Sequence, residues 1–204
     1  MVEKNTTNHH RRSIRMKGYD YSLAGGYFIT VVTYQRSCIF GEVVNGEVKL
    51  NQYGSVAFQQ WIRLGKRFKR SSFLTFTIMP NHVHAIVCIV RGAGVEFEHE
   101  FSGNTPLRPY HIPIATPGSL GAIVRAYKAS VTYRINALRG KTEPPIWQRN
   151  YYDHIVRHEK EYEDIWKYIE TKPKNWTDDQ LNPFPVNVQH QEYNLDNLTN
   201  TLCN

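Results

Sequence analysis

Cysteine is scarce in this chain, and its spacing excludes two ways of stabilising a small protein. The 204 residues include only Cys38, Cys88 and Cys203, and no two of them form a Cys-x-x-Cys pair. A disulfide framework needs several cysteines at short spacings, and a zinc finger needs paired cysteines or a Cys-His set. We therefore expect an ordinary hydrophobic core, for which the chain is long enough.

Long apolar runs are missing as well. No run of apolar residues approaches the roughly 18 that cross a membrane, and the polar, basic residues 1–17 contain no apolar signal segment. We therefore expect a soluble cytoplasmic protein with no membrane attachment. The pattern predicts a disordered basic arm at 1–17, one domain at 18–176 and a polar, largely disordered tail at 177–204.

Acidic residues are outnumbered by basic ones. The 25 lysines and arginines against 18 acidic residues give a net charge of +7, and the chain also contains 13 tyrosines and 4 tryptophans. A positive charge favours a polyanionic partner, and aromatic rings interleaved with cations are typical of proteins that bind single-stranded nucleic acid. Most of these rings are expected in the core, so composition alone indicates a partner class and no more.

The hydrophobic periodicity alternates between strand and helix patterns. It predicts strands at 27–34, 73–79, 82–90 and 152–156, a small hairpin at 42–50 around Asn45-Gly46, and helices at 51–68, 118–138 and 158–171. The second and third of these strands are expected to pair as a hairpin. Residues 91–117 lose the pattern and are expected to form an irregular insert within the domain.

The segment MPNHVH at residues 79–84 is the most informative stretch. In a strand, His82 and His84 point to the same face, and two neutral imidazoles at that spacing can share a divalent metal ion. A His-x-His pair by itself is common by chance and is often structural. Here the pair opens the apolar run AIVCIV at 85–90, which predicts a buried strand and thus a rigid support for metal ligands.

A cluster of cations borders the apolar face of the helix expected at 118–138. Arg125, Lys128 and Arg139 lie together on a helical wheel. Such an edge can follow a phosphate backbone, so we predict that these residues bind DNA. An ordinary solvated helix face would show the same pattern.

Three segments together resemble a known family: MPNHVH at 79–84, WQRNYYDH at 147–154 and YIETKP at 168–173. In type and order they are similar to the motifs of the IS200-like single-tyrosine (HUH, Y1) transposases, and within that family to the REP-associated tyrosine transposases. The resemblance covers about residues 20–176. It implies an α+β, ferredoxin-like sandwich, in which a central antiparallel sheet carries helices packed on one face.

The resemblance also implies an activity. His82 and His84 would bind Mg²⁺ or Mn²⁺, and Tyr168 would attack a phosphate of single-stranded DNA, which yields a 5′-phosphotyrosine link and a free 3′-hydroxyl. The substrates of the family are DNA hairpins of imperfect palindromes, and its members act as monomers or homodimers. Because the implied substrate is chromosomal DNA, an enzyme associated with the nucleoid is expected. The rival tyrosines Tyr127, Tyr151 and Tyr152 are expected to pack in the core or against the sheet.

The resemblance extends to residues around the second motif. Trp147, Arg149 and His154 are expected to shape the site or to contact DNA. The alternatives are a loop anchored by a buried tryptophan and an ordinary surface histidine.

Lys172 departs from the family pattern. The family has an amide side chain four residues after the tyrosine, as the third metal contact, and this chain has Lys172 there. A protonated amine cannot ligate a cation and repels it. Either metal binding is weakened, or Lys172 contacts the phosphate itself, or another group completes the site.

Three other functions compete with a transposase. A hairpin-binding protein that has lost catalysis would keep the same motifs. A metallophosphoesterase without a covalent intermediate would need further His or Asp clusters, or a second His-x-Ser/Thr motif, and the sequence contains neither. An RNA-binding domain of the RRM type would share the fold, but the aromatic pattern of its RNA-binding strands is absent.

Overall fold

The computed structural model describes residues 19–90 and 118–184. The arm predicted at 1–17, the insert predicted at 91–117 and the tail from residue 185 onward lie outside the described residues. Within the described part, four strands form an antiparallel sheet in the order β4-β5-β1-β6. The strands are β1 at Gly25–Val32, β4 at Ser71–Ile78, β5 at His82–Ile89 and β6 at Tyr152–Val156.

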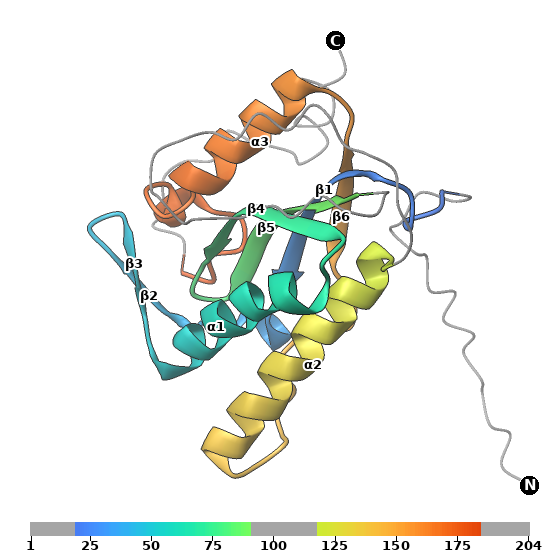
Figure 1. The fold of residues 1–204 in the computed structure, drawn as a ribbon. Coiled ribbons are helices and arrows are strands. Elements are labelled where there is room, and N and C mark those ends of the chain that lie inside the picture. The colour runs from blue at the N-terminus through green and yellow to red at the C-terminus, as the bar shows by residue number, and fades with distance from the viewer. Residues whose placement is uncertain (1–18, 91–117, 185–204) are drawn as a thin grey trace, which may run out of the picture.

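Helices alternate with these strands along the chain (Figure 1). They are α1 at Gln52–Arg67, α2 at Leu120–Arg139 and α3 at Glu159–Thr171, and a separate hairpin joins β2 at Gly41–Val44 to β3 at Glu47–Leu50. The order β1-α1-β4-β5-α2-β6, with β1 and β5 in the middle of the sheet, is the ferredoxin-like arrangement. The predicted α+β class with its antiparallel sheet is confirmed.

Local signals in the sequence explain where the elements begin and end. The Asn51 side chain accepts hydrogen bonds from two backbone N–H groups of the first turn of α1, and the Ser119 side chain accepts one from the backbone N–H of Ala122 in α2. Gly140 ends α2 in the left-handed conformation, at φ 65°. Asn45 and Gly46, both at positive φ, form the two-residue turn that the sequence predicts between β2 and β3.

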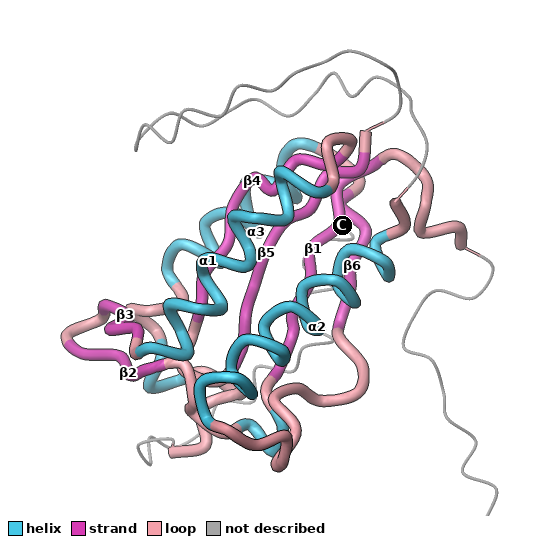
Figure 2. The backbone as a smooth tube through the Cα atoms, turned by 60° about the horizontal axis from the view of Figure 1, so that its bottom comes forward, coloured by secondary structure: helices cyan, strands magenta, loops and turns pink. Residues whose placement is uncertain are grey.

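The helices cover both faces of the sheet (Figures 1 and 2). Helices α1 and α2 pack on one face, where Trp61 and Tyr127 join the main core with Ile29 of β1. Helix α3 lies across the other face and buries Ile165 and Ile169. The expectation of helices on one face therefore holds for α1 and α2, whereas the apolar stripe of α3 covers the face that these two leave open.

The folded part extends beyond the boundary predicted at residue 176. A 3₁₀ turn at Trp176–Asp178 follows α3, and Asp179 and Asn182 are buried. The Asn81 side chain donates a hydrogen bond of 2.6 Å to the carbonyl oxygen of Leu181. Residues 176–184, called here the C-terminal segment, thus belong to the domain and not to a disordered tail.

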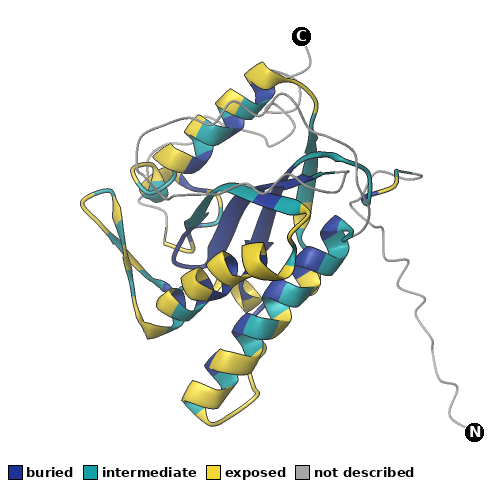
Figure 3. Ribbon diagram, viewed as in Figure 1, coloured by how far each residue is buried: buried dark blue, intermediate teal, exposed yellow. Residues whose placement is uncertain are grey.

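Burial follows the layers (Figure 3). All eight residues of β5 are buried, whereas the outward faces of the helices are exposed. None of the helices in the described ranges is long and apolar enough to cross a membrane.

Candidate metal centre

Strand β5 carries His82 and His84 on the face that α3 covers. The strand pairs with β1, which sets His84 opposite Thr30, and the two imidazole rings lie 4.5 Å apart between centroids. Both histidines are almost fully buried, at 0% and 2% exposure. The same-face geometry expected from the His-x-His spacing is present, on a central strand.

Each histidine has one ring nitrogen held by a neighbour. Nδ1 of His82 lies 2.7 Å from Oδ1 of Asn81, and Nδ1 of His84 lies 2.9 Å from Oγ1 of Thr30. Asn81 Oδ1 can only accept, so Nδ1 of His82 carries the proton and Nε2 keeps its lone pair. Neither Nε2 atom has a hydrogen-bond partner among the described residues, although both are buried. Unpaired buried nitrogens of this kind are suited to a metal ion.

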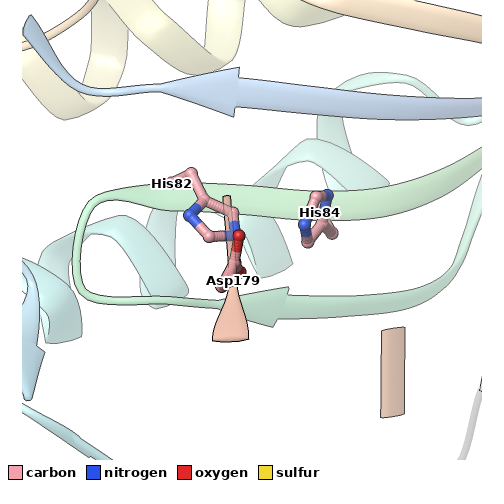
Figure 4. A group of neighbouring side chains, drawn as sticks. All are labelled: His82, His84 and Asp179. Carbon is pink, nitrogen blue, oxygen red and sulfur yellow. The ribbon is translucent and has the colours of Figure 1, made fainter. Parts of the chain in front are cut away.

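Asp179 of the C-terminal segment brings a carboxylate to the same place (Figure 4). Its Oδ1 accepts a hydrogen bond of 2.8 Å from the backbone N–H of Leu181, which orients the group. Its Oδ2 lies 3.6 Å from Nε2 of His82. Ligand atoms of Asp179, His82 and His84 all lie within 4.8 Å of one another.

This group can hold a metal ion. Two atoms that bind one small divalent cation at about 2.1 Å lie about 3.0–3.4 Å apart at octahedral cis or tetrahedral angles, so the three side chains would have to draw closer together to complete the coordination. Two imidazoles and one carboxylate form a donor set that divalent first-row metals accept, and Mg²⁺ accepts it less well. The two Nε2 atoms and Asp179 Oδ2 are buried and have no hydrogen-bond partner among the described residues, and they fit such an ion chemically.

Burial keeps both histidines neutral, which is the form that binds metals. Desolvation lowers the pKa of His82 to about 3, although the Asp179 carboxylate opposes the shift. The pKa of His84 falls well below its ordinary value, because of burial first and then the nearby His82 and Lys172. Neither imidazole therefore has to lose its second proton before it binds a metal at neutral pH.

Tyr168 reaches this centre from α3. Its ring centroid lies 5.2 Å from that of His84 and 5.9 Å from that of Phe28. Burial raises the pKa of the Tyr168 phenol, and the neighbouring Lys172 ammonium offsets part of that shift. Among the tyrosines considered from the sequence, Tyr127 lies in the main core, whereas Tyr152 packs edge-on against Phe28, with the ring centroids 6.2 Å apart.

Lys172, one turn after Tyr168, connects the tyrosine to the carboxylate. Its Nζ lies 4.4 Å from the centroid of the Tyr168 ring and 3.2 Å from Oδ2 of Asp179. The sequence left open that another group completes the metal site in place of Lys172, and the Asp179 carboxylate is a candidate for that group.

Two of the cations predicted to bind DNA are engaged within the protein. Lys128 donates to the backbone carbonyl oxygens of residues 148–150, and burial lowers its pKa to about 8. Arg139 donates to the carbonyl oxygens of Lys141, Thr142 and Pro144. These side chains hold the loop after α2 against the helix. A helical wheel cannot distinguish cations that bind such a loop from cations that face solvent.

Two further residues predicted to contact DNA, Trp147 and His154, are also engaged within the protein. Trp147 is a core residue, whose ring packs on Phe40 and Tyr127 and whose Nε1 donates to the carbonyl oxygen of Lys128. His154 lies 2.8 Å from the buried carboxylate of Glu161.

Arg125 and Arg149 are exposed, on opposite walls of a groove of about 1000 Å³ between α2 and residues 142–151. Within the described residues these two cations keep the solvent exposure that a DNA contact requires.

Sequence reasoning missed four polar groups, three of them at the centre. Asn81 and Thr30 orient the histidines, and Asp179 offers a ligand atom. The fourth, Glu161, accepts from His154. Asn81 lies inside the MPNHVH motif and could have been identified there. Asp179 lies in an aperiodic polar stretch and has no comparable signal.

Comparisons with known proteins include one sequence relative and several solved structures, two of which are described below. No protein-family profile matches the sequence. An uncharacterised protein of Haemophilus influenzae is 38% identical over 174 residues, which cover 85% of this chain and 93% of that protein.

Among solved structures, a REP-associated tyrosine transposase bound to a REP hairpin matches with a TM-score of 0.49 at 18% identity, over 83% of this chain and 80% of that one. A candidate transposase from Deinococcus radiodurans matches with a TM-score of 0.42 at 15% identity, over 78% and 96%. At these values neither likeness assigns a function to the chain.

Proposed function

The chain belongs to the same family as the Haemophilus influenzae protein, and from its own site we propose that it is a metal-dependent endonuclease and strand transferase for single-stranded DNA. The proposed substrate is hairpin DNA, and the proposed nucleophile is Tyr168. The motif resemblance to the IS200-like transposases supports this proposal. The expected place of action is the chromosome in the cytoplasm.

The observation that carries the proposal is the contact between Tyr168 and the candidate metal centre. A phenol ring lies 5.2 Å from the His84 ring, and three buried ligand atoms converge beside it. A phosphate bound at the ligands would therefore lie within reach of the phenol. Core tyrosines rarely have such neighbours, because unpaired imidazole nitrogens are costly to bury.

The chemistry divides between the bound ion and the side chains. A divalent ion, when bound, neutralises phosphate charge and orients the group for in-line attack. Tyr168 Oη forms a bond to phosphorus while the bond from phosphorus to the 3′ oxygen breaks. The proton lost by the phenol balances the proton gained by the 3′-hydroxyl. The phosphotyrosine link conserves the energy of the phosphodiester, so rejoining requires no nucleotide cofactor.

Lys172 has a proposed role toward the substrate. Its ammonium lies over the Tyr168 ring, and its side chain keeps 13% exposure to solvent. A phosphate approaching Tyr168 would meet this charge, and an ammonium is a common phosphate contact. We propose that Lys172 supports phosphate binding, while Asp179 takes the place of the family's amide ligand.

The proposed contact for the rest of the DNA is the groove between α2 and residues 142–151. Arg125 and Arg149 are exposed on its walls, and Tyr133, also on its wall, is 76% exposed. Cations that contact phosphates, together with an exposed ring that stacks on a base, suit a single strand or a hairpin loop. The groove lies on the α2 side of the sheet, away from the centre.

Covalent trapping tests the proposal. Purified protein is incubated with Mn²⁺ or Mg²⁺ and with labelled single-stranded hairpins drawn from repeats that flank its gene, and then resolved on denaturing gels. We expect labelled protein with the wild type and none with Tyr168→Phe or with the double variant His82→Ala/His84→Ala. Tyr152→Phe is the matched control and should retain the adduct. An adduct that survives Tyr168→Phe would assign the nucleophile to another tyrosine.

A second candidate is a hairpin-binding protein without catalysis. The ion pair between Lys172 and Asp179 favours it, because an ammonium occupies one side of a proposed ligand. Tight binding of a recognised hairpin, with neither an adduct nor a cleaved strand at any Mn²⁺ concentration, would favour this candidate over the enzyme.

A further inference from the structure

One carboxylate oxygen of Asp179 lies near both the Lys172 ammonium and the candidate metal centre. Oδ2 of Asp179 lies 3.2 Å from Nζ of Lys172 and 3.6 Å from Nε2 of His82, and it accepts no hydrogen bond from the described residues. The Asp179 side chain is only 2% exposed, so solvent screens its charge little. The Lys172 ammonium is therefore the charge that compensates this carboxylate in the structure.

A divalent ion at the centre would need the same oxygen. His82 and His84 offer one nitrogen each, and Oδ2 is the carboxylate atom on their side, because Oδ1 accepts from the backbone of Leu181. An ammonium within contact distance of that oxygen repels an approaching cation and withdraws charge from the ligand. Metal and ammonium thus compete for one atom.

We propose that Lys172 is a built-in competitor of the metal, so that metal binding exchanges the Lys172 ammonium for the divalent ion at Asp179. The exchange frees the ammonium while its side chain remains beside Tyr168. The ligand charge is neutralised in both states, so Asp179 is never left as a bare buried anion. This inference concerns control of the metal site used by the proposed function, and it does not depend on DNA cleavage.

The exchange also links the metal to the C-terminal segment. Asp179 is the only one of the three ligands that is not on β5, and Asn81 and Arg36 bind the segment through the carbonyl oxygens of Leu181 and Gln180. A metal bond from β5 to Asp179 would add a further connection between them. Metal binding is therefore expected to tighten the docking of residues 176–184.

The test measures Mn²⁺ affinity by electron paramagnetic resonance on the full chain, without DNA. Lys172→Met removes the ammonium and keeps a long side chain that Mn²⁺ does not favour as a ligand. We expect it to tighten Mn²⁺ binding by about tenfold or more. Lys167→Met is the matched control, because it removes the same charge from the exposed face of the same helix, and its affinity should equal that of the wild type.

A second pair of variants identifies the atom involved. Asp179→Asn is expected to weaken Mn²⁺ binding at least tenfold, and adding Lys172→Met to it should no longer tighten binding by the same factor. Amide hydrogen exchange should slow in residues 176–184 when Mn²⁺ is added to the wild type, and should not slow in Asp179→Asn. Circular dichroism establishes that each variant is folded.

Equal affinities of Lys172→Met and Lys167→Met would overturn the competition. An unchanged affinity in Asp179→Asn would remove Asp179 from the ligand set. Neither result depends on a covalent adduct. Absence of an adduct in the trapping experiment would contradict the proposed enzyme and not the competition between Lys172 and the metal. Equal Mn²⁺ affinities would contradict the competition and not the proposed enzyme.

Discussion

The two faces of β5 are equally buried and chemically opposite. On the α1–α2 side, Val83, Ala85 and Val87 join the main apolar core. On the α3 side, His82 and His84 occupy the first positions of the strand, and only Ile86 and Cys88 are left for a small second cluster. One strand thus supports a continuous core on one face and a group of polar atoms on the other.

The difference shows where stability and function are separated in this fold. Apolar burial on the α1–α2 side contributes about 25 cal/mol per Å². On the α3 side, unpaired nitrogens at His82 and His84 cost free energy in the absence of a ligand, which a fold tolerates where it binds something. Substitutions on the two faces should therefore separate stability from activity.

The largest expected effect is on the polar face. The variant His82→Ala/His84→Ala should reduce DNA cleavage by at least about a thousandfold, because the bound ion supplies several kcal/mol of transition-state stabilisation. Initial rates on a labelled hairpin measure the loss. Urea unfolding in metal-free buffer should show that the variant unfolds in a cooperative transition, as a folded protein does. If this variant retained the cleavage rate, the centre would have no catalytic part.

On the apolar face, Ile29→Ala should cost about 2–5 kcal/mol of unfolding free energy, because the side chain is fully buried in the main core. Urea unfolding measures the loss. At temperatures where the variant is folded, its Mn²⁺ affinity should match that of the wild type. A large loss of affinity with little loss of stability would contradict the division between the two faces.

Glu161 lies on α3 and is polar, but we expect it to contribute to the stability of the fold and not to the metal centre. Burial raises the pKa of its carboxyl, but hydrogen bonds from the Arg157 backbone at 2.5 Å and from His154 at 2.8 Å outweigh burial and hold the pKa below its ordinary value. Glu161→Gln should cost about 1–3 kcal/mol at pH 7.

The sign of the pH dependence follows from the lowered pKa of Glu161. Its contribution to stability is present above the unfolded-state pKa near 4.5 and is lost as the pH falls through the lower folded-state pKa. The wild type and Glu161→Gln should therefore converge in stability below pH 4.5 in urea unfolding measured across pH. A constant difference down to pH 2 would show that the charge is not the cause.

The smallest expected effect concerns the groove. Arg125→Glu/Arg149→Glu should weaken binding of a single-stranded hairpin about tenfold, and should lower the slope of log affinity against log salt by about 1.4, for two lost phosphate contacts. Arg63→Glu, on the exposed surface of α1, is the control and should change neither quantity appreciably. Equal effects in both variants would indicate a general charge effect without a localised contact.

Much of the fold could be predicted from local pattern. Clustered β-branched and aromatic residues identified β1, a continuous apolar run identified β5, helical spacing identified α1, α2 and α3, and Asn45-Gly46 identified the turn between β2 and β3. These signals are local because a strand or helix repeats its pattern every few residues. The side of the sheet that α3 covers is not a local property, and the sequence did not indicate it.

The candidate site was predictable only in part. The spacing of His82 and His84 alone places two imidazoles on one face of β5, since side chains alternate along a strand. Lys128 and Arg139 show the limit of that reasoning, because a cation at a helix edge has the same spacing whether it contacts phosphate or a carbonyl oxygen of its own chain. The difference depends on where the loop after α2 runs.

The sequence by itself determined the strand, its paired histidines and the tyrosine helix, because each depends on residues close together in the chain. Only the tertiary structure decided that Asp179 lies beside the histidines. The link that brings it there joins Asn81 to Leu181, residues 100 positions apart, through a hydrogen bond to an irregular backbone segment. No periodic pattern records such a contact, because it arises from packing and from the need to pair buried polar groups.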